Sequence, residues 1–413
     1  MMSGKVITHE AFGPSEGGWI RRNIFLGKTP FQYFKSLLTP FNIICGAILA
    51  VGIPVMIWRL VAGLGATTNL SNTNPWGFWL GFDMFAGVAV ATGGFVVGTA
   101  VYIFGAEEYR PLVRPAILTG FLGYFFAIVG LIFDLGRPWR IYYPFFVSLG
   151  TASVLFLVAE HLALYLMAQL IEWFPAIAEW LGLKKVRSIM TKLTVGSVIL
   201  GAVLVTGHQS ALGAIYLIMP SRLHPLWYTT FIPFLFYISA IAGGLAMLVI
   251  ESMISHKVFG HQISHEDHEK FDRLTLGLGK AAAIVLVTYF VLKIIGVAHG
   301  QNWDLLGTSW GTLFGVEMLG FVLLPIVMYY IGVVKGSARL VRITSVLTVV
   351  GVIFNRFIVS MAALNWNAPE VYIPKWSEVM LSLTLVTIGV LIFRWVVNRM
   401  PILYRLPDYN DGH

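Results

Sequence analysis

The chain has 413 residues, of which 57% are hydrophobic and only 12% are charged. Soluble globular domains carry about 25% charged residues, so this composition excludes a soluble fold and indicates a protein that uses lipid as its solvent. The one cysteine, Cys45, excludes an internal disulfide framework, and it excludes an iron–sulfur cluster held by this chain alone because such clusters take about four thiolates.

Ten apolar stretches are long enough to cross a bilayer as helices, which takes about 20 residues each. A polar segment, 1–42, precedes the first stretch, and a short tail, 398–413, follows the last. We therefore predict an all-α integral membrane protein, and we expect no cleaved signal peptide because no short apolar segment lies near the start. The predicted spans are residues 43–63, 77–104, 112–136, 146–174, 193–219, 226–255, 278–298, 310–331, 338–363 and 377–397.

Lysine and arginine residues are unevenly distributed over the predicted loops. Twenty lie in the N-terminal segment, the even-numbered loops and the C-terminal tail, whereas four lie in the odd-numbered loops. Basic loops remain on the cytoplasmic side of a membrane, so we predict that both ends of the chain are cytoplasmic. This topology explains the net charge of +8, and no nucleic-acid partner is expected.

A weak internal repeat relates the second and sixth predicted spans. Asn-Pro-Trp at 74–76 opens the second span, and His-Pro-Leu-Trp at 224–227 opens the sixth. A Gly-Gly pair follows at 93–94 and at 243–244, 18 residues after the proline in both copies. The alternative is chance agreement of two glycine pairs. The repeat predicts two four-helix bundles, 77–219 and 226–363, flanked by the helices at 43–63 and 377–397.

Most of the ionisable residues within the predicted spans fall in the first bundle. A charge inside hydrocarbon is costly, so each such residue is a functional candidate. Asp83 lies among aromatic residues on the second span, Glu160 and His161 lie near the middle of the fourth, and His208 lies in the outer half of the fifth. Carboxyl and imidazole groups gathered in one bundle suit proton exchange. Hydrogen bonds between helices are the structural alternative.

Two further groups of charges have structural interpretations. Asp134 and Arg137 close the outer end of the third span, and their i,i+3 spacing allows an ion pair in which Asp134 orders Arg137. Arg137 would alternatively hold a substrate oxygen. In the second bundle, Lys293, Glu317 and Arg356 are predicted to form a structural network whose two basic side chains reach toward the membrane surface.

The aromatic and ionisable residues of the first bundle together predict a site for a quinone ring. Trp79 and Phe82 supply apolar walls beside Asp83. Reduction of a quinone takes up two electrons and two protons, and because the chain has no redox centre of its own, a redox partner must supply the electrons. Tyr102 and Glu107, at the inner end of the second span, are candidates for the start of a proton path, with a solvated loop face as the alternative.

Other functions remain compatible with the same residues. A membrane transporter or an ion or proton channel would use them as its path. A haem b membrane anchor would need two histidines at matched depth, whereas His161 and His208 differ in depth by about 6 Å. The tryptophan and tyrosine residues of the outer loops indicate either an interfacial belt or a docked partner.

Several motifs resemble the NrfD/PsrC family, the polysulfide-reductase membrane subunits. They are Asp-Leu-Gly-Arg-Pro at 134–138, Asn-Arg-Phe at 355–357, Tyr-Ile-Pro-Lys-Trp-Ser-Glu at 372–378 and Asn-Pro-Trp-Gly at 74–77. Their order and the number of spans resemble the ten-helix branch of that family. This branch includes the hydrogenase-2 membrane subunit and the membrane subunits of redox complexes in sulfate-reducing bacteria, and the resemblance is strongest to the quinone reductase complex of those bacteria.

The resemblance implies a subunit without haem or iron–sulfur cluster that exchanges electrons with menaquinone, with menaquinone reduction as the expected direction. It also implies a bacterial cytoplasmic membrane and periplasmic partners, namely an iron–sulfur subunit together with a multihaem cytochrome c and a molybdopterin-family subunit. The quinone pocket is expected in the first bundle near the periplasmic face. Onto that pocket we place Asp83, Arg137, Glu160, His161 and His208, of which only Arg137 lies in one of the motifs.

Overall fold

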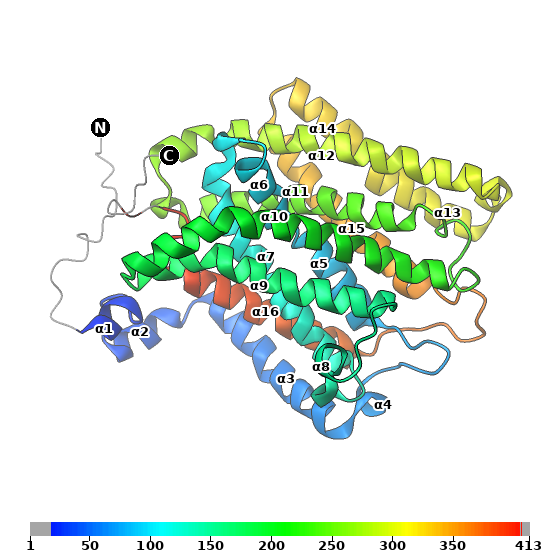
Figure 1. Cartoon of the computed structure of the whole chain (residues 1–413), viewed down its shortest axis with the longest axis horizontal. Helices are drawn as coiled ribbons and strands as arrows, with labels where there is room; N and C mark the ends of the chain where they lie inside the picture. The colour runs from blue at the N-terminus through cyan, green and yellow to red at the C-terminus, as the bar shows by residue number, and fades with distance from the viewer. Residues whose placement is uncertain (1–17, 405, 407–413) are drawn as a thin grey trace.

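The computed structural model describes residues 18–404 and residue 406, and within these residues the regular elements are helices. Ten helical stretches of the described chain are long and apolar enough to cross a membrane, and most of them run along the long axis of the molecule (Figure 1). The predicted all-α class with ten spans is confirmed. The spans are Pro40–Ala62, Leu80–Tyr102, Glu107–Asp134, Val154–Trp180, Lys184–Ile218, Ile232–Gln262, His265–His299, Ser309–Val334, Ala338–Ala362 and Trp376–Val397.

The two ends of the described chain lie at the same end of the molecule, which we call the terminal side; the opposite end is the far side. Helices α1 (Trp19–Asn23) and α2 (Pro30–Leu37) lie there beside the end of α16 (Trp376–Val397) (Figure 1). The sequence analysis had placed both short helices within an undivided polar segment. Helix α2 begins where it does because Thr29 and Gln32 make a capping box, with a proline at the first helical position.

Helix boundaries differ from the predicted spans where polar residues continue a helix beyond the apolar stretch. Helix α12 (His265–His299) begins well before the predicted residue 278, because Ser264 caps it by accepting a hydrogen bond from the backbone N–H of Asp267. Helix α9 (Val154–Trp180) begins later than predicted. The residues before it form a far-side loop that contains the short helix α8 (Tyr143–Phe146).

Three spans contain π-helical segments, which are rare and often lie at functional sites. The second span begins with the π segment η2 (Leu80–Ala86) and continues through α5 (Gly87–Val90) and α6 (Gly93–Tyr102). The eighth and ninth spans contain η8 (Val316–Leu323) and η9 (Ile358–Ala362). Segments η2 and η9 lie in the far-side half of their spans, and η8 reaches the middle of its span.

Helices α6 and α11 (Ile232–Phe259) cross where the sequence repeat places its two glycine pairs. A Cβ atom added to Gly244 would lie 2.4 Å from Thr92 Oγ1 and 2.9 Å from the backbone nitrogen of Gly93. The Thr92 hydroxyl also donates a hydrogen bond to the carbonyl of Ala240, with 2.7 Å between the oxygen atoms. Small residues permit such close approach of two membrane helices. The arrangement in two four-helix bundles stays a prediction.

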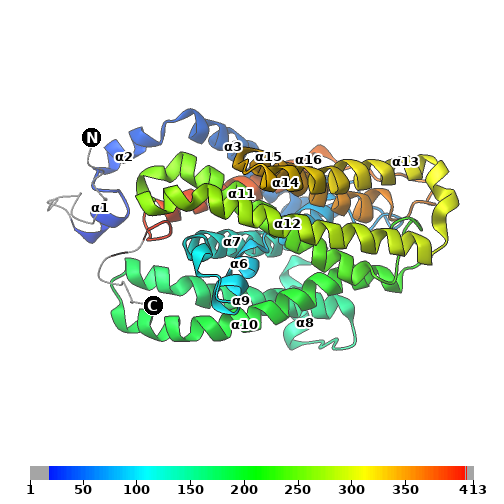
Figure 2. The ribbon, with the colours of Figure 1, turned by 90° about the horizontal axis from the view of Figure 1, so that it is seen from above.

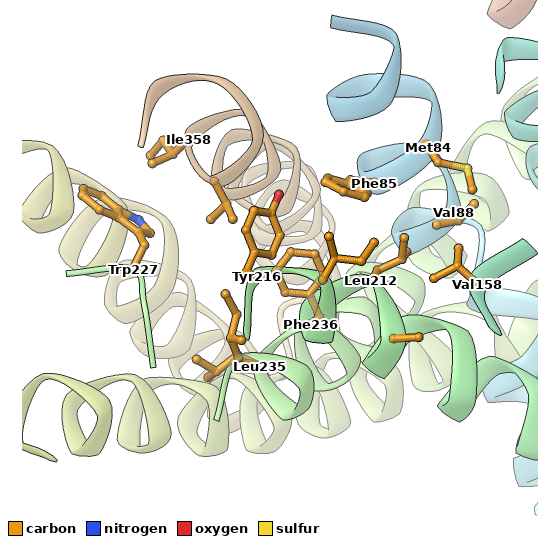
Figure 3. Packing of buried hydrophobic residues seen from close by; sticks show 14 of the residues in the cluster. Met84, Phe85, Val88, Val158, Leu212, Tyr216, Trp227, Leu235, Phe236 and Ile358 are labelled. Carbon is orange, nitrogen blue, oxygen red and sulfur yellow. The ribbon is translucent and has the colours of Figure 1, made fainter. Parts of the chain in front are cut away.

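The outer helices pack around a shared aromatic core. Helices α3 (Pro40–Ala62) and α16 pack on each other, and α16 packs against α7 (Arg110–Asp134). Figure 2 shows α9 and α10 (Lys184–Ala214) along the opposite edge of the molecule. Between them, the rings of Phe85, Tyr216 and Phe236 lie 5.7–6.1 Å apart between centroids (Figure 3). These rings come from both halves of the repeat, so the core joins the two halves.

Candidate functional site

His208 on α10 (Lys184–Ala214) is fully buried. Its Nδ1 lies 2.9 Å from the carbonyl oxygen of Leu204, and its Nε2 lies 2.8 Å from the hydroxyl oxygen of Tyr124 on α7. The carbonyl can only accept, so Nδ1 carries the proton, Nε2 is the acceptor and the Tyr124 hydroxyl donates to it. Gln209 donates from Nε2 to the carbonyl of Val88, while its Oε1 has no hydrogen-bond partner among the described residues.

His161 and Glu160 lie at the edge of this buried pair. A Cβ atom added to Gly207 would lie 2.6 Å from Cδ2 of His161, so the His161 ring packs against the residue that precedes His208. Both His161 and Glu160 are half-buried. The Nδ1 of His161 lies 2.7 Å from the carbonyl oxygen of Leu157, and no described residue pairs with the Glu160 carboxylate. The structure thus brings together two of the predicted site residues, His161 and His208, and Glu160 precedes His161 on the same helix.

We call His208, Tyr124 and His161 the histidine centre. A line of polar side chains, of which Tyr165 and Gln169 are fully buried, runs from this centre along α9 toward the terminal side. The Tyr165 ring meets the Tyr124 ring edge-on, with 4.6 Å between centroids, and its hydroxyl accepts a hydrogen bond from Nε2 of Gln169 at 3.2 Å. One turn further, Glu172 interacts with the side chain of Ser197 on α10. Residues three or four apart share one helix face. We call His161, Tyr165, Gln169 and Glu172 the α9 polar line.

A cavity lies at the terminal side between α7, α11 and α12. Glu251 and His256 line it, and each has a buried atom, Oε1 and Nε2 respectively, without a hydrogen-bond partner among the described residues. Thr119 of α7 interacts with the Glu251 carboxyl group. A Cβ atom added to the next residue, Gly120, would lie 2.5 Å from Nε2 of Gln169. The cavity and the α9 polar line therefore meet on the same turn of α7.

Asp83 belongs to a different neighbourhood from His208. Its Oδ2 accepts a hydrogen bond from the Ser382 hydroxyl on α16 at 2.6 Å. A Cβ atom added to Gly130 would lie 2.9 Å from the Asp83 Cβ, so the aspartate also packs closely against α7. Trp79 points the same way, because its indole N–H donates to the carbonyl of Glu378 at 2.9 Å. Both predicted site residues therefore contact the tenth span.

The charge that opposes Asp134 comes from the first span. Arg59 is buried, donates to the carbonyl oxygens of Phe133 and Leu135 at 2.7 Å each, and acts electrostatically on Asp134. Arg137 is exposed and makes no ion pair with Asp134. The predicted ion pair in which Asp134 orders Arg137 is therefore absent. The turn that follows α7 directs Arg137 outward, and Arg59 binds the end of α7 instead.

Glu378 completes a group of three carboxyl side chains on the far side. Its Oε1 accepts hydrogen bonds from the backbone N–H groups of Asn69 at 2.9 Å and Lys375 at 3.1 Å. The Tyr372 hydroxyl donates to the same carboxylate, and burial together with this carboxylate raises the pKa of Tyr372. These contacts fasten two far-side loops to the tenth span. We call Asp83, Asp134 and Glu378 the far-side carboxyl cluster.

The remaining predicted residues lie apart from the histidine centre. Phe82 stacks on Phe357 of the ninth span, with 5.9 Å between ring centroids. Glu107 is exposed at the terminal side and ion-paired with Arg110, whose guanidinium lies 5.7 Å from the centre of the Tyr102 ring. This arrangement matches the solvated-face alternative for Glu107.

The second bundle contains its own buried charged network. Oε2 of Glu317 accepts a hydrogen bond from the Trp227 indole N–H at 2.6 Å, and Nζ of Lys293 lies 4.0 Å from Oε1. Arg356 donates to the carbonyl of Phe236 at 3.1 Å. The predicted network is present. Lys293 and Arg356 are buried and do not extend to the membrane surface, because their partners, the Glu317 carboxylate and the Phe236 carbonyl, lie inside the protein.

The contacts of the two histidines bear on the haem-anchor alternative. Both ring nitrogens of His208 are engaged, one with the Leu204 carbonyl and one with the Tyr124 hydroxyl. The His161 ring packs on Gly207, so its helix lies directly against that of His208. Among residues 18–404 no cluster of three His, Cys, Asp or Glu side chains is arranged to hold a metal ion.

Several polar residues around the histidine centre, in the cavity and at the end of the third span were not predicted from the sequence. The spacing of residues 161, 165, 169 and 172 along one helix face was a readable signal for the α9 polar line. The contact between Glu251 and Thr119 had no comparable signal, because it depends on how the sixth span packs on the third. The residues that were missed are Arg59, Tyr124, Tyr165, Gln169, Glu172 and Glu251.

Comparisons with known proteins agree with this architecture. The chain is 46% identical over 381 residues to a protein of Nitratidesulfovibrio vulgaris (strain Hildenborough), covering 92% of this chain and 98% of that one. It is 28% identical to the probable Ni/Fe-hydrogenase 2 b-type cytochrome subunit of Escherichia coli (strain K12), over 87% of this chain and 91% of that subunit. It is 25% identical to the integral membrane subunit of the menaquinone reductase of N. vulgaris, over 85% and 88% of the two chains. Residues 66–367 match the family model for polysulphide reductase, NrfD, and the chain therefore belongs to the NrfD family, as its motifs predicted.

Proposed function

We propose that this chain is the quinone-exchanging membrane subunit of a respiratory oxidoreductase complex. Two relatives support this role: one is named the integral membrane subunit of a menaquinone reductase, and the other a probable b-type cytochrome subunit of a Ni/Fe-hydrogenase. We further propose menaquinone as the quinone and its reduction as the direction. Electrons would come from a periplasmic iron–sulfur subunit, which would receive them from further partners such as a multihaem cytochrome c or a molybdopterin-family subunit.

The quinone headgroup, in this proposal, lies beside the histidine centre on the lipid-facing edge of α9. Glu160 and His161 are half-buried there and neighbour the fully buried pair of His208 and Tyr124. A carbonyl oxygen that gains electron density needs a nearby donor and then a proton. One observation carries the proposal. The half-buried side chains at this edge of α9 lie at one end of the α9 polar line, which extends from there toward the terminal side.

Protons would reach the histidine centre from the terminal side, which is the side that the distribution of lysine and arginine predicts to be cytoplasmic. The cavity beside Glu251 is the entry, Thr119 and Gln169 connect it to the α9 polar line, and Tyr165 lies between that line and Tyr124. This route replaces Tyr102 and Glu107 as the start of the path. Electrons from one side and protons from the other would make quinone reduction electrogenic.

The far-side carboxyl cluster has a supporting role in this proposal. Asp83 is hydrogen-bonded to Ser382, and Glu378 holds two far-side loops. These contacts fix the tenth span against the second and third, and thereby fix the surface from which Arg137 projects. Trp79 and Phe82 belong to the same packing between helices rather than to the quinone headgroup.

Turnover of the purified complex with a soluble menaquinone analogue tests the assignment. Tyr124→Phe removes one hydroxyl without changing the ring, and His208→Gln keeps a polar side chain. Each is expected to lower turnover by about 100-fold, the lower end for loss of a general acid–base group, while the subunits still copurify. Asp83→Asn is the matched control, because it alters a buried carboxyl of similar depth outside the histidine centre, and it should keep most of the activity.

The reverse result would relocate the site. If Asp83→Asn abolishes turnover while Tyr124→Phe and His208→Gln leave it unchanged, the quinone reacts at the far-side carboxyl cluster. If the parent complex does not react with any quinone, the redox proposal itself fails.

A further inference from the structure

Helix α2 exposes an apolar face that no described residue covers. The exposed fractions of Phe31, Phe34 and Leu38 are 79%, 65% and 73%. Their spacing of three and four residues places them along one side of the helix. Gln32 and Ser36 lie at other positions of the same short helix and are polar. The segment is therefore amphipathic, with its apolar side directed away from the protein.

The orientation of this helix is fixed by contacts on its other side. The Arg399 guanidinium, at the end of α16, donates to the Tyr33 hydroxyl and to the carbonyl of Ile24, with 2.7 Å for each bond. The Tyr33 ring also packs edge-on against Phe25, with 5.5 Å between centroids. Because Tyr33 points into the protein, the side chains of Phe31 and Phe34 are held outward.

The depth of α2 follows from its junction with the first membrane span. Thr39 caps α3 by accepting a hydrogen bond from the backbone of Asn42, and α3 then runs without a break for 23 residues. At 1.5 Å per residue this is about 34 Å, slightly more than the roughly 30 Å of hydrocarbon in a bilayer. Pro40 therefore lies near the edge of the hydrocarbon. Helix α2 ends only three residues earlier, at Leu37, which places it at the level of the lipid headgroups.

We propose that α2 is a docking surface for anionic phospholipid in the terminal-side leaflet. Phe31, Phe34 and Leu38 would enter the outer acyl region, and the exposed side chains of Lys28 and Lys35 would meet headgroup phosphates. Apolar side chains flanked by lysines on a helix at this depth are the arrangement that binds such a surface. This binding does not depend on any quinone chemistry.

Fluorescence quenching by brominated lipids tests the depth of the helix. The full chain with Cys45, its only cysteine, replaced by alanine is the parent. A bimane label is attached in turn to Phe31→Cys, Phe34→Cys and the control Gln32→Cys, and each protein is reconstituted in nanodiscs. Quenching should be about twofold stronger at 31 and 34 than at 32, because only the apolar face enters the acyl region. Equal, weak quenching at all three positions would show that a second copy or a partner subunit covers the face, and would overturn the proposal.

Lipid preference tests the headgroup contact. Retention of phosphatidylglycerol relative to phosphatidylcholine is measured by native mass spectrometry of the purified chain. Lys28→Gln and Lys35→Gln should each weaken the preference by up to about fivefold, since a lysine near an anionic surface contributes on the order of 1 kcal/mol. Lys335→Gln is the control, because it removes the same charge from an exposed site on the terminal side away from α2. A preference that falls equally in the control, or does not fall at all, would refute the assignment.

Discussion

Replacing Gly244 by alanine is expected to destabilise the protein at the crossing of α6 and α11. The new methyl group would lie 2.4 Å from Thr92 Oγ1, 2.9 Å from the Gly93 nitrogen and 3.0 Å from the Thr92 carbonyl carbon. Two of these atoms are backbone, and the Thr92 hydroxyl is itself hydrogen-bonded to Ala240, so none can rotate away. The two helices must therefore separate.

The magnitude follows from two opposing effects. Overpacking of a tight interior costs about 1–3 kcal/mol, and the upper end applies here because two of the three close atoms are backbone. The better helix propensity of alanine returns up to about 1 kcal/mol, which leaves a net loss of about 2 kcal/mol. The matched control is the neighbouring Gly243→Ala, whose methyl group would lie 3.5 Å from Val352, an ordinary contact distance. That variant should be neutral or slightly stabilised.

Thermal unfolding of the two variants in the same detergent gives the comparison. Gly244→Ala should unfold several degrees below the parent protein, and Gly243→Ala should not. Equal thermal unfolding midpoints for the two variants would contradict the crossing of the helices at this glycine pair. They would also contradict the close contact between the two halves of the repeat.

Three further predictions concern other parts of the structure. Glu317→Gln should cost about 3–5 kcal/mol in unfolding free energy, because it leaves the buried Lys293 without its carboxylate, and a wild-type thermal midpoint would contradict the buried network. Ser382→Ala should cost about 1 kcal/mol through the lost hydrogen bond to Asp83, measured in the same assay. Burial lowers the pKa of His224, so the folded state resists its protonation; stability should therefore be complete above the unfolded-state value near pH 6.5 and should fall as the pH drops below it. A thermal midpoint recorded between pH 8 and pH 5 should show this fall in the parent protein and a smaller one in His224→Phe, and identical profiles would exclude His224 as its source.

The spans were predictable from the sequence because hydrophobicity over about 20 residues is a local property. The extent of each helix was less predictable. Helix α12 continues through charged residues before 278 because a serine caps it and solvent accommodates the charges. The amphipathic helix α2 is held by Arg399, which lies at the other end of the chain, and no local pattern reveals that partner.

The sequence indicated which residues are candidates for the site, but it did not indicate which of them lie together. His161 and His208 were selected because ionisable side chains are rare in hydrocarbon, and they do lie together. Asp83 was grouped with them by its depth and by its place in the first predicted bundle. Depth says nothing about which way a side chain faces, and the π segment that carries Asp83 turns it toward Ser382. The pairing of Arg59 with the end of the third span likewise depends on packing between helices distant in sequence.

The π segments also bear on how this protein family changes over time. Each wide turn accommodates one residue more than an α-helix would at the same place, as in η2 and η8. Deleting a single residue inside such a turn would let it relax to regular α-helix while every later side chain of that span keeps its heading. A homologue shorter by one residue within 80–86 could thus retain Thr92 and the glycines after it in place, whereas the same loss within α9 would rotate the whole polar line out of alignment.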